Sequence, residues 1–480
     1  MSRTVLVWFR RDLRLTDNPA LQAALDRGAH VVPVYVHAPD EEAPWAPGAA
    51  SRWWLHHSLA ALDGSLQRCG SRLVIVRGPT LAALRSLVAA TGAGGVYWNR
   101  LYEPALRERD ATVKAALRAD GLQAESFNSA LLFEPWTLQT QGGQPYRVFS
   151  PFWRNGEPRL RDVRTPTPAP PTLPTAETLP VGEPLSALDL LPRIAWDAGF
   201  GPVWTPGEEG AHARLTQFLD GPVDDYRQRR DLPAATDGTS GLSPHLHFGE
   251  IGPVQILAAL RARGPLGHQA QHYVRELGWR EFAHHLLHHY PQTPEMPLYH
   301  DKFGAFPWRK ADDYADNLRA WQQGRTGIPI VDAGMRQLWT TGWMHNRVRM
   351  IVASFLAKNL LTPWQEGARW FWDTLVDASL ANNTLGWQWA AGCGADAAPY
   401  FRIFNPVLQS EKFDAEGRYL ATWVPALGAV DLKRRHAPWT AAVAPTGYPA
   451  PIVDLAATRA RGPRAGHRRP RPSVAGARCQ

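Results

Sequence analysis

The chain has 480 residues, of which 44% are hydrophobic and 20% charged, and its formal net charge is +8. At roughly 100–200 residues per domain, this length predicts two or three domains, and the composition excludes a disordered chain. No apolar run reaches the roughly 18 residues of a membrane span, the N-terminus lacks the pattern of a signal peptide, and three cysteines cannot form a disulfide framework. We therefore expect a soluble, cytoplasmic protein.

The apolar pattern predicts an α/β domain over residues 1–132. Runs of strand length and helical patterns alternate, the strands at 4–9, 30–36, 72–76 and 95–98 and the helices at 18–27, 52–69, 80–91 and 105–119. This order is typical of a doubly wound, Rossmann-like parallel sheet. The charged segment Arg10–Arg14 follows the first strand, and we favour a solvated loop over a ligand site there.

The remaining chain changes character twice. A Pro-rich stretch predicts an interdomain linker over 133–206, and helical patterns predict an all-α domain over 207–456. The last segment, 457–480, is rich in Pro, Arg and Gly and is expected to be disordered. Its seven arginines account for most of the net charge, so any nucleic-acid-binding face must be a local patch.

Tryptophan is the unusual residue of this sequence. The chain has 21 tryptophans, and ten of them lie between Trp279 and Trp389. Leucine and phenylalanine fill a core without a buried N–H group that needs a partner. The enrichment therefore indicates stacking surfaces or electron transfer.

Two helical patterns place polar and aromatic side chains on one face. Glu276, Trp279 and Arg280 have i, i+3, i+4 spacing, which suits base contact, stacking and phosphate pairing. The alternative, which we favour for the spacing alone, is a Trp at a helix–helix contact beside a surface ion pair. Asn346, Arg349 and Met350 repeat the pattern, where the alternative is a helix cap followed by a core Met.

A further segment combines polar groups with two tryptophans. Asp377, Asn382, Asn383, Trp387 and Trp389 crowd a glycine-containing stretch, and this polar density favours a site over a core. On a helix, the two tryptophans diverge by about 200°, so each faces a different environment.

Hydroxyl groups also precede a predicted helix start at Pro244. Thr239, Ser240 and Ser243 predict either an anion site or an ordinary capped turn. The histidines His284, His285, His288 and His289 have no acid or Cys that completes a ligand set, so we expect no metal site.

Long motifs in the same order resemble the photolyase/cryptochrome family. They are WFRRDLRLTDNPAL, TSGLSPHLHFGEI, GWREF, GRTGIPIVDAGMRQLWTTGWMHNRVRM and NTLGWQW. The segments SRWWLHHSLAAL and PYRVFSPFWR are most similar to the bacterial class III branch of cyclobutane pyrimidine dimer photolyases. The resemblance implies an N-terminal antenna domain and a helical domain that binds FAD.

The resemblance also implies roles for individual residues. The flavin contacts would be Tyr226, Thr239, Ser240, Gly241, Leu242, Ser243, Arg280, Arg349, Asp377, Ser379 and Asn383. The dimer pocket would be formed by Glu276, Trp279, Asn346, Met350 and Trp389, with Arg230 and Arg347 on the DNA backbone. Photoreduction would pass through Trp387, Trp364 and Trp308. The implied reaction is light-driven dimer repair in UV-damaged DNA by a monomer.

This sequence departs from the family pattern in three places. Ser379 stands where the family has a second acid, and Trp308 lies at a different separation from Trp321. The folate-binding Asn-Glu pair is replaced by Ala105-Leu106, while the class III resemblance favours a methenyltetrahydrofolate antenna near Trp53 or Trp54. The alternatives are a cryptochrome photoreceptor without repair activity and a non-catalytic single-strand binder.

Overall fold

The computed structural model describes residues 4–176, 178–299, 303, 306–397, 402–441, 443 and 445–466. The chain forms two compact units. The first unit comprises Met1–Glu295, Arg336–Arg347 and Ala368–Gly386, and the second comprises Met296–Met335, Val348–Gly367 and Trp387–Gln480. The domain boundaries at 132 and 207 stay predictions, because the first unit holds both the sheet and part of the helical region.

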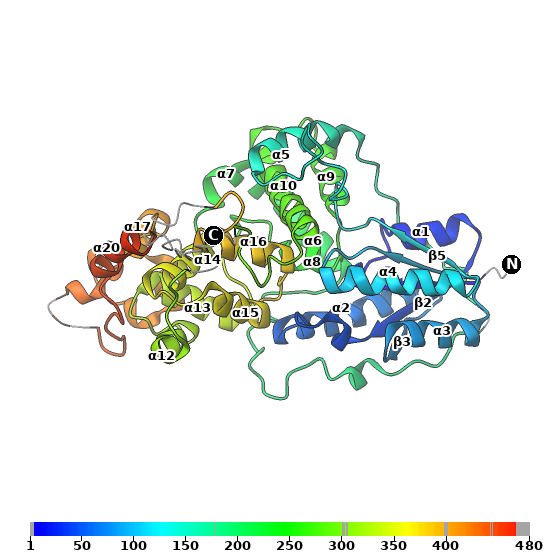
Figure 1. Ribbon diagram of the computed structural model, residues 1–480, viewed down its shortest axis with the longest axis horizontal. Helices are drawn as coiled ribbons and strands as arrows, with labels where there is room; N and C mark the ends of the chain where they lie inside the picture. The colour runs from blue at the N-terminus through cyan, green and yellow to red at the C-terminus, as the bar shows by residue number, and fades with distance from the viewer. Residues whose placement is uncertain are drawn as a thin grey trace, which may run out of the picture. The chain divides into compact units, whose positions relative to one another are not determined.

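The first unit contains a five-stranded parallel sheet in the order β3-β2-β1-β4-β5 (Figure 1). The strands are β1 (Thr4–Phe9), β2 (His30–His37), β3 (Val74–Arg77), β4 (Gly95–Asn99) and β5 (Gln123–Phe127). The predicted α/β class is confirmed. The sequence pattern missed β5, because this edge strand reads QAESF and lacks an apolar run.

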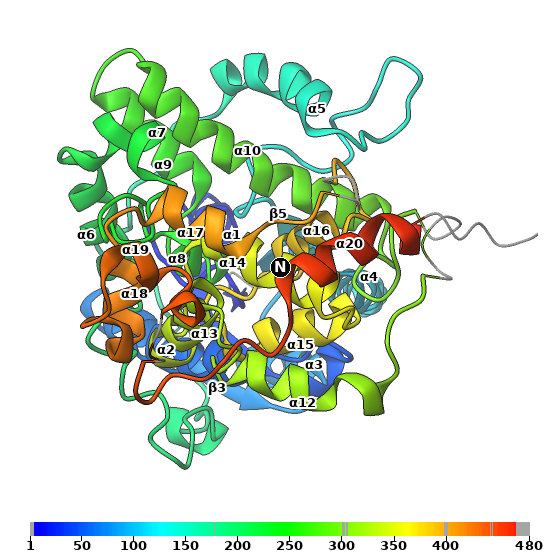
Figure 2. The ribbon, with the colours of Figure 1, turned by 90° about the vertical axis from the view of Figure 1, so that its left-hand side faces the viewer.

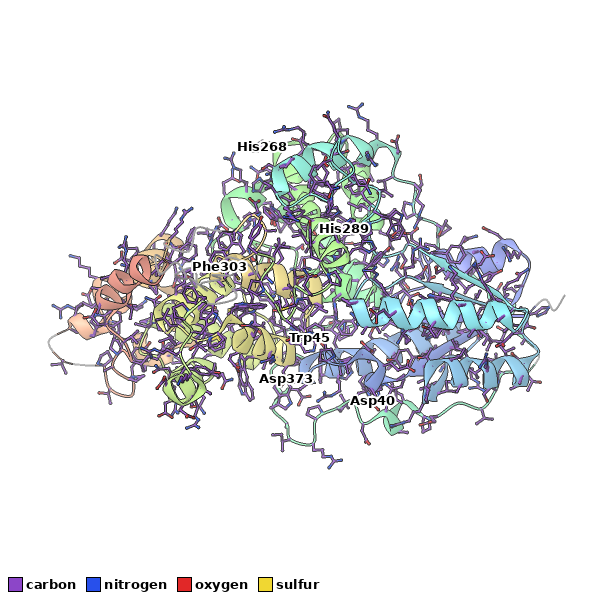
Figure 3. All side chains as sticks on the ribbon, in the orientation of Figure 1. Asp40, Trp45, His268, His289, Phe303 and Asp373 are labelled. Carbon is purple, nitrogen blue, oxygen red and sulfur yellow. The ribbon has the colours of Figure 1, made fainter. Side chains whose placement is uncertain are left out.

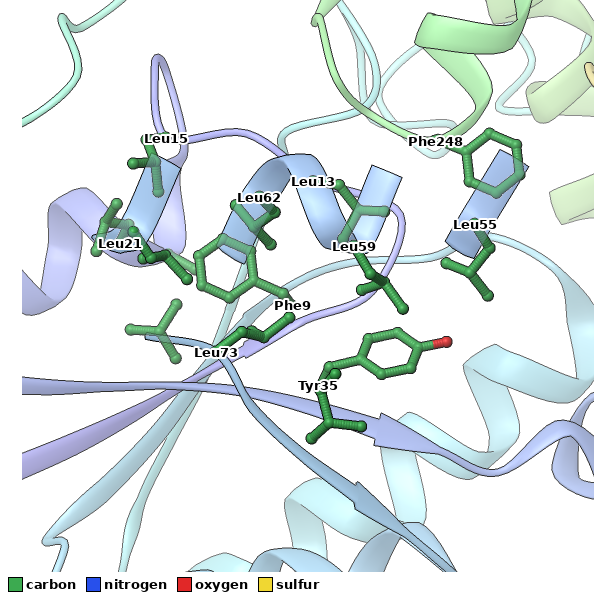
Figure 4. Close-up of a cluster of buried hydrophobic side chains, with 14 of the residues drawn as sticks. Phe9, Leu13, Leu15, Leu21, Tyr35, Leu55, Leu59, Leu62, Leu73 and Phe248 are labelled. Carbon is green, nitrogen blue, oxygen red and sulfur yellow. The ribbon is translucent and has the colours of Figure 1, made fainter. Parts of the chain in front are cut away.

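Alternate side chains of the strands support two separate cores. Helices α1 (Pro19–Asp26) and α2 (Ala49–Arg68) pack on one face, where Phe9 and Tyr35 lie (Figure 4). Helices α3 (Thr80–Thr91) and α4 (Pro104–Ala119) pack on the other face. This is the doubly wound arrangement expected when strands are buried on both sides.

Helices dominate the rest of the described chain, which contains no further strand of a sheet. The longest is α10 (His268–His289), drawn in green in Figure 2, with both end residues labelled in Figure 3. The other α-helices are α5 (Phe149–Gly156), α6 (Glu208–Leu219), α7 (Tyr226–Arg229), α8 (Ser243–His247), α9 (Pro253–Ala262), α12 (Ala311–Gln322), α13 (Pro329–Thr341), α14 (Asn346–Ser354), α15 (Trp364–Thr374), α16 (Leu380–Ala391), α17 (Pro406–Phe413), α18 (Arg418–Trp423), α19 (Leu432–Arg435) and α20 (Leu455–Gly466). None of the helices described combines the length and apolar character needed to cross a membrane.

Short helical turns occur between these helices. The 3₁₀ segments are η1 (Pro39–Glu42), η2 (Glu157–Asp162), η3 (Leu185–Leu188), η4 (Pro222–Asp225), η6 (Pro425–Leu427) and η7 (Pro438–Thr440), and η5 (Phe355–Asn359) is a π-helix. Helix α20 continues past the predicted boundary at residue 456. Asp454 caps the start of this helix by accepting from the backbone N–H groups of Ala456 and Ala457. Residues 467–480 of the predicted tail lie outside the described residues.

The Pro-rich stretch lies against the sheet. The backbone N–H of Val31 donates to Pro174 O at 2.7 Å, and that of Glu183 donates to Ile75 O at 2.7 Å. These bonds satisfy backbone groups near β2 and β3 that have no strand beside them. The stretch therefore has a structural role in addition to connecting two regions.

The prediction of a solvated loop at Arg10–Arg14 is wrong. Arg10, Asp12 and Arg14 are buried, with Arg14 only 1% exposed. The Arg14 guanidinium donates to four backbone oxygens, those of Thr16, Asp17, Ser129 and Gly249, at 2.8–3.1 Å. Charge alone suggested solvent exposure, whereas the fold supplies enough acceptors to bury this cation.

The same loop contacts the residues that follow α8. The backbone N–H of Leu13 donates to Phe248 O at 3.1 Å. Gly249 has a φ of 65°, and a Cβ there would lie 2.1 Å from the carbonyl oxygen of Arg11. A side chain at residue 249 is therefore excluded, and the loop after β1 sets the position of α8.

The histidines of α10 hold another segment of the chain. His285 Nδ1 donates to Pro135 O at 2.9 Å, and its Nε2 accepts from the backbone N–H of Tyr146 at 3.0 Å. Burial, followed by the nearby His289, lowers the pKa of His285 to about 4. The neutral imidazole that this leaves at neutral pH is the form that can both donate and accept.

Substituting Arg14 by alanine is expected to destabilise the protein. The change leaves four buried carbonyl oxygens without their donor, which costs about 3 kcal/mol of unfolding free energy. Urea unfolding followed by circular dichroism measures this loss. The control is Arg68→Ala, which removes an exposed cation paired with Glu209 and is expected to cost less than about 0.5 kcal/mol. Equal losses in the two variants would contradict the structural role of Arg14.

Candidate functional site

A loop from Thr239 to Ser243 leads into α8 in the first unit. Ser240 Oγ accepts from the Tyr273 hydroxyl at 3.1 Å, and Gly241 adopts a left-handed conformation with φ 63°. No side chain caps α8, but Ser240 Oγ also accepts from the backbone N–H of Leu242 at 3.3 Å, as in an ordinary turn, so the choice between an anion site and a turn stays open. Within the described part of the chain, the Thr239 hydroxyl has no hydrogen-bond partner. The loop therefore offers donors to an anionic ligand.

Residues 342 and 343 join this loop to the start of α16. Trp343 Nε1 donates to Ser243 Oγ at 3.3 Å, and the backbone N–H of Val376 donates to Gly342 O at 2.8 Å. Asp377 follows Val376 directly. The predicted hydroxyl loop and the predicted Asp377 segment thus converge in one unit.

The first turns of α16 orient Asn383. Its side-chain Nδ2 donates to Ala368 O at 2.9 Å, and its backbone N–H donates to Ser379 O at 2.8 Å. Among the described residues, no group donates to Asn383 Oδ1. The amide is therefore oriented so that an acceptor oxygen remains for a ligand. Asp377 and Ser379 are buried, whereas Asn382 is exposed.

Four charged side chains form a network that we call the arginine–carboxylate cluster: Arg230, Asp231, Glu276 and Arg347. Arg230 forms an ion pair with Glu276. Asp231 Oδ2 lies 2.8 Å from Arg347 Nη2, and Asp231 Oδ1 lies 3.8 Å from Arg230 Nε. The structure thus brings together three predicted substrate residues through Asp231, which sequence reasoning did not single out.

Tyr226 packs beside this cluster. The Arg230 guanidinium lies over its ring, 5.5 Å from the ring centroid. Burial raises the pKa of Tyr226, so its hydroxyl is a neutral donor, and it makes no hydrogen bond within the described residues. Burial alone would lower the pKa of Arg230, but Tyr226, Glu276 and Asp231 outweigh it and hold the pKa above its ordinary value. Arg230 is therefore permanently charged.

The predicted residues on α10 have separate partners. The ring of Trp279 stacks on Phe149 at 3.7 Å between centroids and 9° between planes, so it does form a helix–helix contact, yet it is half-buried rather than buried. Arg280 Nη1 donates to Ala130 O at 2.7 Å. The structure thus gives Arg280 a contact that anchors α10, and its contact with a cofactor stays a prediction.

Asn346 begins α14 and is exposed. The alternative of a capping Asn is not observed, since His345 Nδ1 accepts from the backbone N–H of Arg347 at 3.1 Å. The capping acceptor is thus the residue before Asn346. The side chain of Asn346 is accessible for a substrate.

The other predicted residues belong to the second unit: Trp308, Arg349, Met350, Trp364, Trp387 and Trp389. Trp387 is buried, with its ring centroid 6.1 Å from that of Trp321. Trp389 is half-buried, and its ring lies 6.3 Å from that of Phe404. The prediction that the two tryptophans face different environments is confirmed. The ion pair between Arg349 and Asp377 stays a prediction.

Trp53 and Trp54 do not form the predicted stacking surface. They are 5% and 0% exposed in the core beneath the sheet, and Trp54 Nε1 donates to Glu250 Oε1 at 2.9 Å. The ring of Phe200 lies 5.2 Å from that of Trp53. The class III resemblance placed an antenna pigment near these two residues, but their rings fill a core and have protein partners.

Sequence reasoning missed four residues of this region. Asp231, Phe149, Tyr273 and Trp321 contact the predicted residues described above. Tyr273 precedes Glu276 by one helical turn, so helical spacing was a usable signal for it. The contacts of the other three join segments distant in sequence, which local spacing does not reveal.

Comparisons with known proteins show the family of this chain. Residues 5–172 match the family described as DNA photolyase, and residues 273–466 match the family described as FAD binding domain of DNA photolyase. A deoxyribodipyrimidine photo-lyase of Agrobacterium fabrum is 48% identical and covers 95% of this chain and 96% of its own length. Cryptochrome-1 of Arabidopsis thaliana is 38% identical and covers 95% of this chain and 69% of its own length.

A solved structure extends the comparison to the fold. The crystal structure of a bacterial class III photolyase from Agrobacterium tumefaciens has a TM-score of 0.91 and 46% identity, covering 97% of each chain. The chain therefore belongs to the photolyase/cryptochrome family, as the sequence motifs predicted.

Gly241→Ala is expected to weaken flavin binding. The left-handed φ costs a residue with a Cβ roughly 1 kcal/mol, and that Cβ would lie 3.0 Å from Arg214 Nη1, so flavin affinity is expected to fall about 5-fold. Fluorescence of released FAD measures this affinity. The control is Gly121→Ala, which carries a similar backbone cost at φ 80° with open space around the new Cβ. If Gly121→Ala lowers flavin affinity as much as Gly241→Ala, the loop has no direct role.

Proposed function

We propose that this protein is a light-driven deoxyribodipyrimidine photolyase that splits cyclobutane pyrimidine dimers in UV-damaged DNA. The observation that carries the proposal is the arginine–carboxylate cluster, in which Glu276 pairs with Arg230, one helical turn from the half-buried Trp279, and Arg347 is held nearby through Asp231. An acceptor for base edges, a stacking ring and cations for phosphates are the groups that a damaged DNA strand needs.

The residues around α8 and α16 fit FAD. Thr239 and Tyr226 carry hydroxyls without partners in the described chain, and Asn383 has an oriented acceptor oxygen. The loop Thr239–Ser243 and Tyr226 would hold the phosphates. Arg280, Arg349, Asp377, Ser379 and Asn383 would surround the ring system. When bound in its reduced form, FAD supplies the electron that light transfers to the dimer.

Ser379 makes this flavin environment less acidic than the family pattern. The hydroxyl replaces a carboxylate two residues after Asp377 in a buried segment. A neutral group stabilises a negatively charged ring better than an acid does. We expect the ring to hold its negative charge more readily here.

The substrate residues are those that the family resemblance implies. Glu276 accepts from the flipped bases, Trp279 and Trp389 form aromatic walls, and Asn346 and Met350 line the floor. Arg230 and Arg347 bind phosphates, which sets register without reading sequence. Extrusion of the dimer is favoured because damaged bases are already poorly paired.

A tryptophan relay in the second unit serves photoreduction. Trp387 and Trp364 are buried, so their rings are shielded from water, and Trp308 is partly exposed. Trp321 is a further candidate, because its ring lies 6.1 Å from that of Trp387. We propose Trp387, Trp364 and Trp308 as the path to solvent.

We also propose a methenyltetrahydrofolate antenna in the first unit. Since Trp53 and Trp54 are buried, the candidate site is a pocket lined in part by Trp45, Ala105, Leu106 and Trp372, with Arg11 and Glu103 also at its wall. The rings of Trp45 and Trp372 are 5.4 Å apart, and Asp373 lies near Trp45 in Figure 3. Aromatic and apolar walls of this kind suit a planar pigment.

Glu276→Gln is expected to reduce repair. The amide keeps the size of the side chain but loses the charge that strengthens hydrogen bonds from the bases, so affinity for dimer-containing DNA is expected to fall about 10-fold. Binding titrations and light-dependent repair measure the loss, and an unchanged flavin spectrum shows that the fold is intact. The control, Glu209→Gln, changes an 83% exposed acid and is expected to leave repair unchanged. Full repair by Glu276→Gln would contradict the proposed substrate site.

A further inference from the structure

The arginine–carboxylate cluster is balanced in charge without DNA. Its two cations, Arg230 and Arg347, face two anions, Asp231 and Glu276. One oxygen of Glu276, Oε1, pairs with Arg230, and its second oxygen remains for the bases. The two cations, by contrast, are held by carboxylates, so they must exchange partners when the phosphates of a substrate bind.

We propose that Asp231 is a positioning residue that holds Arg230 and Arg347 in the free protein and yields them to the phosphodiester backbone of damaged DNA. This inference rests on the proposed function and deepens it. Asp231 directly follows Arg230 in the chain, whereas Arg347 belongs to the distant helix α14. One carboxylate thus links two cations that local structure alone does not bring together.

The geometry suits such an exchange. The side chains of Asp231, Arg347 and Arg230 are 32%, 19% and 15% exposed, so a phosphate can reach them without unfolding. A guanidinium pairs with a phosphate as well as with a carboxylate. Phosphate binding therefore replaces the bond that Asp231 gives up.

Asp231 also limits the hold of Arg230 on Glu276. Its Oδ1 lies 3.8 Å from Arg230 Nε, so the guanidinium interacts with both carboxylates. Without that charge, Glu276 is the one carboxylate of the cluster left to pair with Arg230, so its negative charge is less available to the bases. At the same time, Arg347 loses its 2.8 Å contact with the Asp231 carboxylate, and removal of this negative charge strengthens its attraction for a phosphate.

The two consequences act in opposite directions on DNA binding. Undamaged DNA uses only phosphate contacts, so loss of a nearby negative charge strengthens its binding. Damaged DNA also needs Glu276, so it gains less. Asp231 is therefore expected to set the ratio of affinities for damaged and undamaged DNA.

The test compares Asp231→Asn and Asp231→Glu with the wild-type holoenzyme. Affinities for a thymine-dimer duplex and the same undamaged duplex are titrated over a range of salt. Asp231→Asn is expected to lower the affinity ratio about 5-fold and to steepen the salt dependence for undamaged DNA by about one unit of slope. Asp231→Glu keeps the charge and is expected to restore most of the ratio.

Asp224→Asn is the matched control. Asp224 lies in the turn η4 just before α7, and it also pairs with an arginine, the exposed Arg263, at 2.8 Å. It is expected to leave the ratio unchanged. An unchanged affinity ratio in Asp231→Asn, including the case in which the affinities for both duplexes fall equally, would overturn the inference. A wild-type protein that discriminates between the duplexes but repairs nothing in light contradicts the proposed function alone. A wild-type protein that does not discriminate overturns both.

Discussion

The buried guanidinium of Arg14 is the interaction on which the position of the site depends. It donates to carbonyl oxygens from the loop after β1, from Ser129 after β5 and from Gly249 after α8. One side chain therefore joins the sheet to the segment that carries the loop Thr239–Ser243. The cost of burying this cation is offset only while all its acceptors remain in place, which makes the arrangement specific.

Helix α10 connects the loop Thr239–Ser243 to the predicted substrate residues. Successive turns of this helix supply side chains with different partners: Tyr273 contacts Ser240, Glu276 contacts Arg230, Trp279 contacts Phe149, Arg280 contacts Ala130 and His285 contacts Pro135. A single rigid element thus fixes the spacing between a phosphate-binding loop and a base-binding carboxylate. Side chains on a helix are held more precisely than side chains on a loop. A ligand that binds them does not have to order the backbone, so less binding free energy is lost.

Much of the fold could be predicted because it depends on local patterns. The alternation of apolar runs and helical patterns gave the order of elements in the α/β region, and the divergence of Trp387 from Trp389 followed from helical geometry. Strand β5 was missed because it lacks an apolar run, and the burial of Arg14 was missed because its acceptors are backbone oxygens, two of them from the distant residues Ser129 and Gly249. Backbone acceptors have no signature in the side-chain sequence.

The site shows the same division. Thr239–Ser243, Glu276 and Asn383 were found from motifs, and their types already indicated their chemistry. Asp231 and Phe149 were not found, because their roles come from contacts with residues far along the chain. Tertiary pairing decides which charged residue stays on the surface and which one holds a functional neighbour.

The most direct test of the proposed dimer repair uses a thymine-dimer oligonucleotide and the flavin-loaded, chemically reduced protein under blue light, with a dark control. If the protein is a photolyase, intact thymine is restored in the light and not in the dark. A flavin-loaded protein that restores no thymine in the light would contradict the proposed dimer repair and would indicate a photoreceptor without repair activity.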